Sequence, residues 1–291
     1  MHAFRVAYDG RPFYGFQRQS NVPTVEDTIF DALRALGVLD SDAAKPPGYA
    51  AAGRTDSGVS AVAQTVAFEC PDWLTPRALN SELPGTIRAW AHADVDDDFH
   101  ATHDAVRRAY VYHLYAPRAT DDPQQPSPPS LDGRRAIDDD RAAAALDALC
   151  GLCDFHNLTP DSQGTERDLS GRLDRAGDFL TIEFAAGGFA RELVRRLVSV
   201  IQAVGTGEKS LSWIDSLLGD DPVDPRPSPA APEPLVLSAV EYPGVDFERD
   251  PEAAERGAIA FGERVVAARS IGRVSTAITE RLRTGEDHAR E

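Results

Sequence analysis

The stretch that most constrains the fold of this chain is a polar segment at residues 53–61, GRTDSGVSA, which interrupts two apolar segments. Small apolar residues precede it and the β-prone residues 62–68 follow it, which predicts a tight loop next to a strand. Gly53 and Gly58 permit sharp turns, so we expect them to hold Asp56 on a bent loop. Arg54 can pair with a carboxylate or a phosphate. The pattern fits both a structural turn and a functional site, because loops on a rigid scaffold often carry function.

Length and composition set the broad class of the protein. A chain of 291 residues with 42% hydrophobic residues can form two domains with ordinary cores. No apolar run reaches the roughly 18 residues of a transmembrane helix, and the N-terminus lacks the apolar region of a signal peptide. Three cysteines cannot build a disulfide framework, which fits a reducing compartment. We therefore expect a cytoplasmic protein.

The charge balance is strongly acidic, with 47 acidic and 30 basic residues and a formal net charge of −17. Only two residues are lysines, so arginine supplies nearly all of the positive charge. Taken alone, this composition argues against a nucleic-acid partner. An acidic surface with few lysines also suits a cytoplasm of very high salt, where the Debye length is about 3 Å or less. We interpret the acidity as the signature of a halophilic host.

The first half of the chain alternates strand and helix patterns, which is typical of an α+β half-domain of the ferredoxin-like type. Thr24 is the expected N-cap of its first helix, with Asp27 at the reciprocal position of a capping box. The elements expected in the second half are a strand at 107–115, an exposed proline-rich loop at 123–129, helices at 138–149 and 190–204, and strands at 180–184 and 235–240. We expect residues 246–291 to form a charged extension that is helical or partly disordered.

Several residues carry candidate chemistry. Tyr110 lies on the aromatic strand, where such a residue belongs to a core more often than to a site. Arg191 and Arg195 are four residues apart on one face of the expected helix. Cys150 and Cys153 form a lone C-x-x-C pair, which is a weak indication of metal, and we expect no metal site.

Four segments together resemble the TruA family of tRNA pseudouridine synthases. Residues 53–61 resemble its catalytic loop, G-R-T-D-x-G-V-H-A, with Ser60 in place of the histidine. Residues 8–19 resemble its Y-D-G-x-x-Y-x-G-W-Q-x-Q signature, with Phe16 in place of the tryptophan. An F-H-A segment that ends in Thr102 instead of arginine precedes Tyr110, and residues 188–198 resemble the family's helix with an active-site arginine. The resemblance covers roughly residues 3–245.

The resemblance implies two ferredoxin-like (RRM-like) halves that form one extended mixed sheet of eight strands flanked by helices. It places the active-site cleft between the halves and implies a homodimer. The corresponding division of the chain is an N-terminal domain at 1–102, a C-terminal domain at 103–245 and the extension at 246–291.

The function implied by the resemblance is the isomerisation of uridine to pseudouridine at positions 38–40 of the tRNA anticodon stem-loop. Asp56 would be the catalytic nucleophile, Arg195 would pair with it and favour its charged form, and Tyr110 would lie against it. Arg54 would contact the RNA. The reaction needs no redox change and no external group, so we expect neither cofactor nor metal.

Three alternatives stay open. The enzyme could modify a different RNA position, or the chain could be a tRNA-binding protein without activity. The third alternative is a hydrolase in which Asp56 works with a second carboxylate of raised pKa, but no motif supplies that group.

Overall fold

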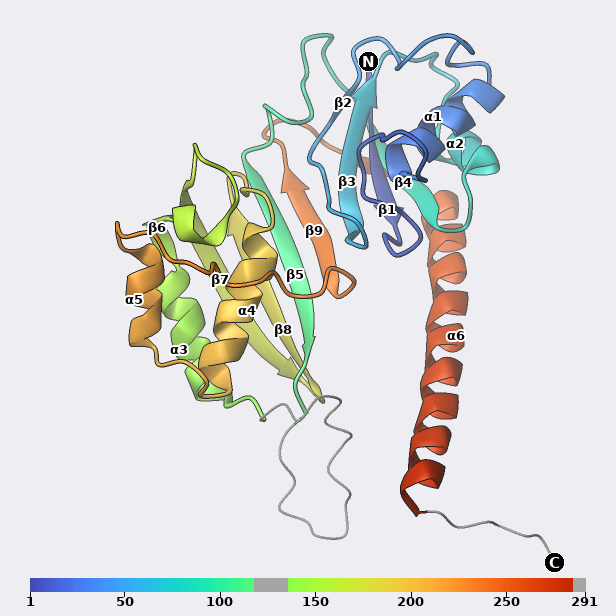
Figure 1. Ribbon diagram of the computed structural model, residues 1–291. Helices are drawn as coiled ribbons and strands as arrows, with labels where there is room; N and C mark the ends of the chain where they lie inside the picture. Colours follow the sequence, from blue (N-terminus) through green and yellow to red (C-terminus); the bar gives the residue numbers. More distant parts are fainter. Residues whose placement is uncertain (118–135, 285–291) are drawn as a thin grey trace, which may run out of the picture.

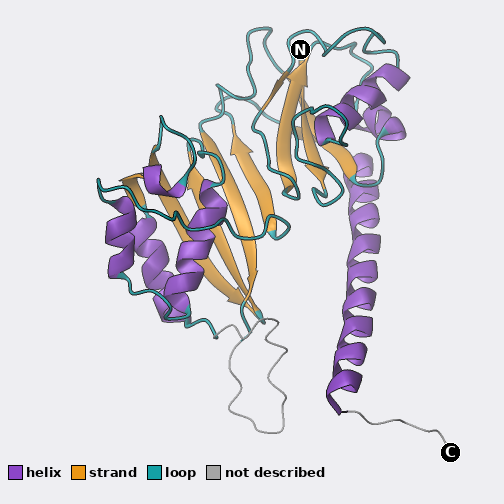
Figure 2. Cartoon of the chain, viewed as in Figure 1, coloured by secondary structure: helices purple, strands orange, loops and turns teal. Residues whose placement is uncertain are grey.

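The structure is a computed structural model that describes residues 1–117 and 136–284. Its centre is one extended mixed sheet with helices at both ends (Figure 2). The strands are β1 (His2–Tyr8), β2 (Ala50–Ala51), β3 (Ser60–Phe68), β4 (Ile87–Asp94), β5 (Arg107–Tyr115), β6 (Gly151–Asp154), β7 (Glu166–Ala176), β8 (Phe179–Ala186), β9 (Leu235–Glu241) and β10 (Glu248–Arg249). The loop expected at 123–129 lies outside the described residues.

The sheet confirms the α+β class, but the expected number of eight strands is wrong. Ten strands are present in the described residues, in the order β10-β4-β1-β3-β9-β5-β8-β7-β6, with β2 paired to β3 off this path. The short β2 and β10 consist of two residues each, which is too short to produce a readable alternation of apolar and polar residues.

The two halves of the sheet meet where β3 pairs with β9. This pairing is parallel, with Ser60 opposite Val236 and Ala61 opposite Leu237, whereas the other strand pairs are antiparallel. Ser60 is also the first residue of β3 and follows the loop that carries Asp56. The polar loop predicted from the sequence therefore lies at the junction of the two halves.

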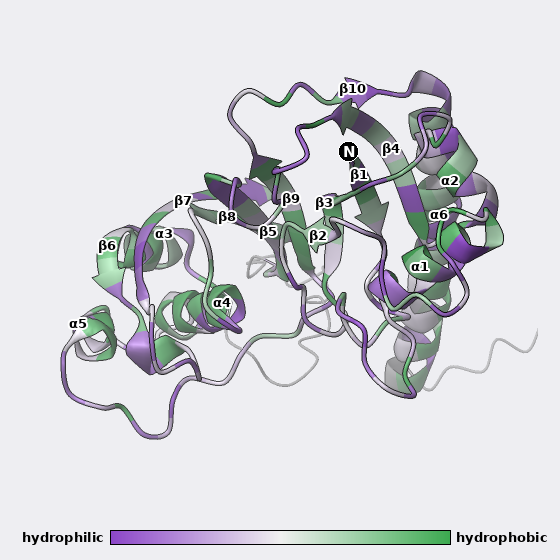
Figure 3. Ribbon diagram, turned by 90° about the horizontal axis from the view of Figure 1, so that it is seen from above, coloured by the Kyte–Doolittle hydropathy of each residue, from purple (hydrophilic) through white to green (hydrophobic). Residues whose placement is uncertain are grey.

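The helices form two groups, one for each half of the sheet (Figure 1). Each group covers a large hydrophobic core, and a third, small cluster consists of Ala3, Ala50, Ala67 and Ala101. The helices are α1 (Val25–Ala35), α2 (Pro76–Glu82), α3 (Asp139–Leu149), α4 (Leu193–Gly205), α5 (Ser212–Leu218) and α6 (Pro251–Thr284). Leu235 belongs to the core of α3 and α4, and Leu237, on the same face of β9, belongs to the core of α1. Both cores therefore lie on one face of the sheet, and the two groups of helices are seen from above in Figure 3.

The start of α1 agrees with the local sequence signal that predicted it. The Thr24 hydroxyl accepts a hydrogen bond from the Asp27 amide at 3.2 Å and donates one to the Asp27 carboxylate at 2.9 Å, which confirms the predicted cap of α1. The C-terminal segment contains the 34-residue helix α6. No helix of the described residues is both long enough and apolar enough to cross a membrane.

Side chains of neighbouring elements fix the Asp56 loop in place. The hydroxyls of Tyr8 and Thr55 share a buried hydrogen bond of 2.8 Å, and the Thr55 carbonyl accepts one from the Phe16 amide at 3.0 Å. The Gln64 side chain donates to the Gly53 carbonyl at 2.8 Å. Residues 8–16 thus form the support of the loop, in addition to any contact they make with a ligand.

Backbone packing against this loop requires glycine at positions outside the loop. A Cβ atom on Gly10 would lie 2.0 Å from the Val59 carbonyl oxygen, and one on Gly15 would lie 3.0 Å from that of Thr55. Within the loop, Gly58 has a φ of +82°, as expected for a sharp bend. Gly53 has no atom within 4 Å of its Cβ position and no positive φ, so the expectation that it holds the bend is wrong.

This difference gives a matched test of the loop's support. We expect Gly10→Ala to destabilise the protein by roughly 1–3 kcal/mol, because the methyl group forces the loop away from β1. Gly53→Ala should change stability by less than about 0.5 kcal/mol. Chemical denaturation of the two variants in concentrated KCl measures both effects. Equal stability of the two variants would contradict the close approach at Gly10.

Candidate active site

A cavity of about 1050 Å³ opens at the junction of the two halves. This volume is slightly above the range of roughly 300–1,000 Å³ that is typical of small-molecule sites. Its charged lining residues are Lys45, Arg54, Arg191 and Arg195 on the basic side and Glu26, Asp56, Asp161 and Glu192 on the acidic side. The cavity is therefore balanced in charge, although the chain as a whole carries −17.

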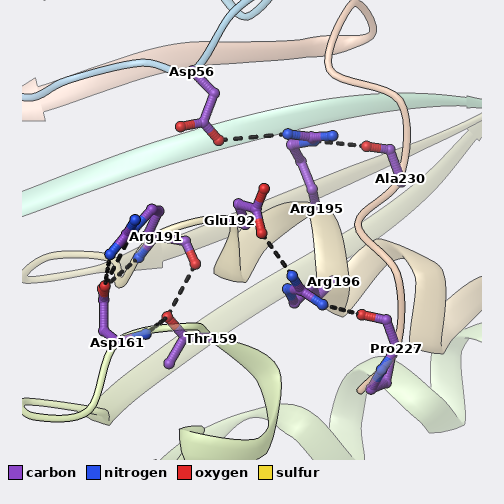
Figure 4. Close-up of polar contacts among 9 residues, drawn as sticks. All are labelled: Asp56, Thr159, Asp161, Arg191, Glu192, Arg195, Arg196, Pro227 and Ala230. Carbon is purple, nitrogen blue, oxygen red and sulfur yellow. Dashed lines mark hydrogen bonds and ion pairs between the residues drawn. The ribbon is translucent and has the colours of Figure 1, made fainter. Parts of the chain in front are cut away.

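Asp56 and Arg195 meet in this cavity, as the sequence predicts (Figure 4). The Arg195 Nη1 atom lies 3.5 Å from the Asp56 Oδ2 atom, and the side chains are 13% and 37% exposed, respectively. The Arg195 Nε atom donates to the Ala230 carbonyl at 2.6 Å, and the Ala230 amide donates to the Arg195 carbonyl at 3.0 Å. The proline-rich segment before β9 thus holds the guanidinium that faces Asp56.

The ionisation of Asp56 depends on two opposing effects. Burial raises the pKa of the Asp56 carboxyl above its ordinary value, and the Arg195 guanidinium lowers it by a smaller amount. The Glu192 carboxylate adds to the rise. Arg195 therefore favours the charged form of Asp56, as expected, but the net direction of the pKa shift is upward.

Tyr110 lies on β5 at the contact between the two cores. It pairs with Leu237 of β9 and Phe184 of β8, and its ring packs edge-on against Phe189 at 5.2 Å between centroids. Burial raises the pKa of Tyr110 to about 12, and the charge of Asp56 contributes to the rise. The hydroxyl therefore keeps its proton at neutral pH, and Tyr110 lines the same cavity as Asp56.

Arg54 is exposed and lines the cavity beside Asp56. It makes no hydrogen bond or ion pair within the described residues, so its guanidinium is available to a ligand. Two of the positions that depart from the family pattern, Ser60 and Thr102, have local partners. The Ser60 hydroxyl accepts a hydrogen bond from the Gly10 amide at 3.0 Å, and the Thr102 hydroxyl donates to the Ala51 carbonyl at 2.6 Å.

Arg108 is a residue of this region that the sequence analysis missed. Its buried guanidinium donates to the carbonyls of Ala52 at 2.8 and 3.0 Å, Thr102 at 2.6 Å and Gly187 at 2.6 Å. It thereby holds together three segments that surround Tyr110 and the Asp56 loop. Its place two residues before Tyr110, in the R-x-Y-x-Y pattern of β5, was the available signal.

The helix expected at 190–204 begins later, at Leu193, because residue 191 is held outside it. The Thr159 hydroxyl donates to the Arg191 carbonyl at 3.0 Å, and the Asp161 carboxylate accepts from the Arg191 amide at 2.9 Å (Figure 4). Glu192 then turns the chain with a φ of +59°. Arg191 and Arg195 therefore do not share a helical face, although both line the cavity.

Arginine side chains also pair with the other carboxylates near Asp56. Arg191 lies 3.0 Å from the Asp161 carboxylate, and Arg196 lies 2.6 Å from that of Glu192. Hydrogen bonds from Arg191 lower the pKa of the Asp161 carboxyl, so this group stays ionised. A hydrolase of the paired-carboxylate type needs a second acid with a raised pKa, and neither neighbour is free for that role.

Cys150 and Cys153 are free thiols. Burial raises the pKa of both, which disfavours the thiolate that metal binding requires. Among the residues at 1–117 and 136–284, no group of three or more His, Cys, Asp and Glu side chains could hold a metal ion.

Known proteins resemble this chain over most of its length. A family model described as tRNA pseudouridine synthase matches residues 145–243. The tRNA pseudouridine synthase A of Natronomonas pharaonis is 57% identical over 91% of this chain and 93% of the relative. The enzyme of Haloarcula marismortui is 51% identical over 97% of this chain and 100% of the relative. That of Archaeoglobus fulgidus is 34% identical over 85% of this chain and 86% of the relative.

The haloarchaeal origin of the first two relatives agrees with the halophilic host inferred from the acidic composition. Similarity at this level extends over nearly the full length of this chain and of the first two relatives. The chain therefore belongs to the tRNA pseudouridine synthase A family, a family of isomerases.

Proposed function

We propose that this protein converts uridine to pseudouridine at positions 38–40 of the tRNA anticodon stem-loop, with Asp56 as the nucleophile. The observation that carries the proposal is a half-buried carboxylate in a cavity, paired with an arginine that is itself fixed by a backbone carbonyl. Family membership supports the class of reaction. The positions 38–40 rest on the resemblance of the sequence motifs.

The reaction exchanges one bond to the ribose for another. The bond between N1 of uracil and C1′ breaks, the base turns, and a bond between C5 and C1′ forms. C5 loses a proton and N1 gains one, so no group is added or removed overall. A single carboxylate in its charged form can supply the nucleophile for this exchange.

In this proposal each site residue has a separate role. Arg195 favours the charged form of the Asp56 carboxyl, which burial would otherwise neutralise. Tyr110 keeps its proton at neutral pH, so its role is to cover the base rather than to act as a general base. Arg54, exposed at the rim, contacts the RNA backbone near the extruded nucleotide.

The target base must leave its stack before it can reach Asp56. The exposed ring of Tyr14 and the free guanidinium of Arg54 line the cavity and offer planar surfaces for such a base. At very high salt, the long-range repulsion between this acidic protein and RNA is screened within about 3 Å. Recognition then relies on RNA shape and on short-range hydrogen bonds.

We also propose a homodimer that acts in the cytoplasm. The resemblance supports a dimer in which one subunit binds the tRNA body and the other presents the site. The tRNA substrate and the low cysteine content support the location.

The first prediction concerns the nucleophile. Asp56→Ala should abolish pseudouridine formation in an unmodified tRNA at high KCl, while the variant still binds the tRNA. Wild type should modify the anticodon stem-loop. The matched control is Asp31→Ala, which removes a carboxylate that is 76% exposed on α1 and should leave activity unchanged. Pseudouridine mapping by sequencing measures all three proteins.

Each outcome of this mapping distinguishes between the alternatives. Modification at another position would keep the chemistry and overturn the proposed substrate site. Full activity of Asp56→Ala would overturn the role of Asp56. A folded wild type that binds several tRNAs without modifying any of them would leave a binding protein without activity.

The second prediction concerns pH. The Asp56 carboxyl must be ionised to react, so the rate falls as pH decreases through its raised pKa. Arg195→Gln removes the group that lowers this pKa, and the acid limb of the kcat profile should therefore move to higher pH. We also expect kcat at neutral pH to fall on the order of 10²-fold, because the carboxylate loses its fixed partner. An unchanged acid limb in single-turnover measurements would contradict the pairing.

A further inference from the structure

The C-terminal helix α6 packs against the body through one face of its first half (Figure 1). This face includes Ala253, Gly257, Ala260 and Arg264, which are buried or partly buried, whereas residues 265–278 are exposed. Spacings of four, three and four residues place these positions on one side of a helix. Arg264 therefore stands at the end of the face that contacts the body.

The start of α6 is fixed to the N-terminal half of the sheet. Arg77 of α2 donates to the Asp250 carboxylate at 3.0 Å, just before the helix begins. The Cβ position of Gly257 lies 3.6 Å from the side chain of Arg88 on β4. A helix is stiff over the roughly 20 Å that separate this start from Arg264. The anchored start thus determines where the Arg264 side chain can reach.

Arg264 reaches a buried carboxylate. Its Nη1 atom lies 3.0 Å from the Oδ2 atom of Asp9, whose side chain is 6% exposed. Arg11 binds the same carboxylate at 2.7 and 2.8 Å, but it belongs to the same turn of the chain. Burial raises the pKa of the Asp9 carboxyl, and the two arginines more than offset this rise, so the group stays ionised. Arg264 ties this charge to an element 255 residues away.

The residues on both sides of Asp9 contact the loop that carries Asp56. Tyr8 shares its buried hydrogen bond with the residue that precedes Asp56. The Gly10 amide donates to the hydroxyl of Ser60 at 3.0 Å, and a Cβ atom on Gly10 would collide with the loop backbone. A displacement of Asp9 would therefore move the support at both ends of the loop.

We propose that Arg264 is a positioning residue, which holds the Asp56 loop in its reactive geometry through Asp9. Neither Arg264 nor Asp9 lines the cavity, so their effect on the reaction is indirect. The inference rests on the proposed function, because the position of the loop affects the rate only if Asp56 reacts. It gives residues 246–264 a role, although they lie outside the part of the chain that the family motifs cover.

The test uses the full chain in concentrated KCl, where long-range effects of charge are screened. Arg264→Gln removes the charge and keeps a good helix former. The single-turnover rate of pseudouridine formation should fall by roughly 10-fold, because a small misplacement of a reacting group is costly, while the Kd for tRNA should change by less than about threefold. Arg264→Lys keeps a charged donor and should recover most of the lost rate.

Two further variants assign the effect to the contact. Arg256→Gln removes the same charge from a side chain of α6 that is 74% exposed, and it should leave the rate and the Kd unchanged. Arg264→Gln combined with Asp9→Asn should slow the reaction no further than Asp9→Asn alone, because the two residues act as a pair. Far-UV circular dichroism checks that every variant is folded.

Amide hydrogen exchange tests the same contact without the reaction. In Arg264→Gln, residues 8–16 and 53–61 should exchange faster than in wild type, because the hydrogen bonds between these segments open more often. Arg256→Gln should exchange like wild type.

Four results would overturn the proposal. The first is unchanged exchange of residues 53–61 in Arg264→Gln, and the second is a loosened loop with the wild-type rate. The third is an unchanged rate with weaker tRNA binding, which would make Arg264 an RNA contact. The fourth is an equal loss of rate in Arg256→Gln, which would make the effect one of charge alone. A wild type that forms no pseudouridine would overturn the proposed function, and the exchange measurement would still decide whether Arg264 holds the loop.

Discussion

The parallel pairing of β3 with β9 is the contact on which the site depends. It joins the two halves of the sheet through only two residue pairs, and the Asp56 loop enters β3 at this point. The same pairing sets β9 beside β5, which places Tyr110 opposite Leu237. The segment before β9 also carries Ala230, the partner of Arg195. One strand therefore brings the aspartate, the tyrosine and the arginine to one cavity from three distant parts of the chain.

The arginines in and beside that cavity have different roles. Arg191 and Arg196 neutralise the nearest acidic neighbours, whereas Arg195 only partly offsets the effect of burial on Asp56. Among these carboxylates Asp56 has the weakest compensation, with its ion pair at 3.5 Å. A nucleophile needs this condition, because a carboxylate held by short hydrogen bonds is stabilised in its resting state. The arrangement can be understood as selective neutralisation around one group that is left reactive.

The sequence was sufficient where the signal was local or formed a complete motif. Thr24 and Asp27 are three residues apart and defined a cap correctly, and the resemblance of residues 188–198 to the family's helix identified Arg195 as the partner of Asp56. The late start of α4 could not be read, because it depends on Thr159, more than thirty residues away. The role of Arg108 was missed for the same reason, since it binds carbonyls 56 and 79 residues distant. The start of α4 and the role of Arg108 both depend on contacts between residues that are far apart in the sequence.

The pairing of β3 with β9, a strand near the end of the chain, has a consequence for how the protein is made. A ribosome synthesises the loop that carries Asp56 long before it reaches β9 or Arg264, so a growing chain exposes β3 as an open edge. Pairings of such wide sequence separation form slowly. A chain that stops before β9 lacks the strand whose Leu235 lines the cavity. The cavity is therefore among the last features of the fold that a growing chain can complete.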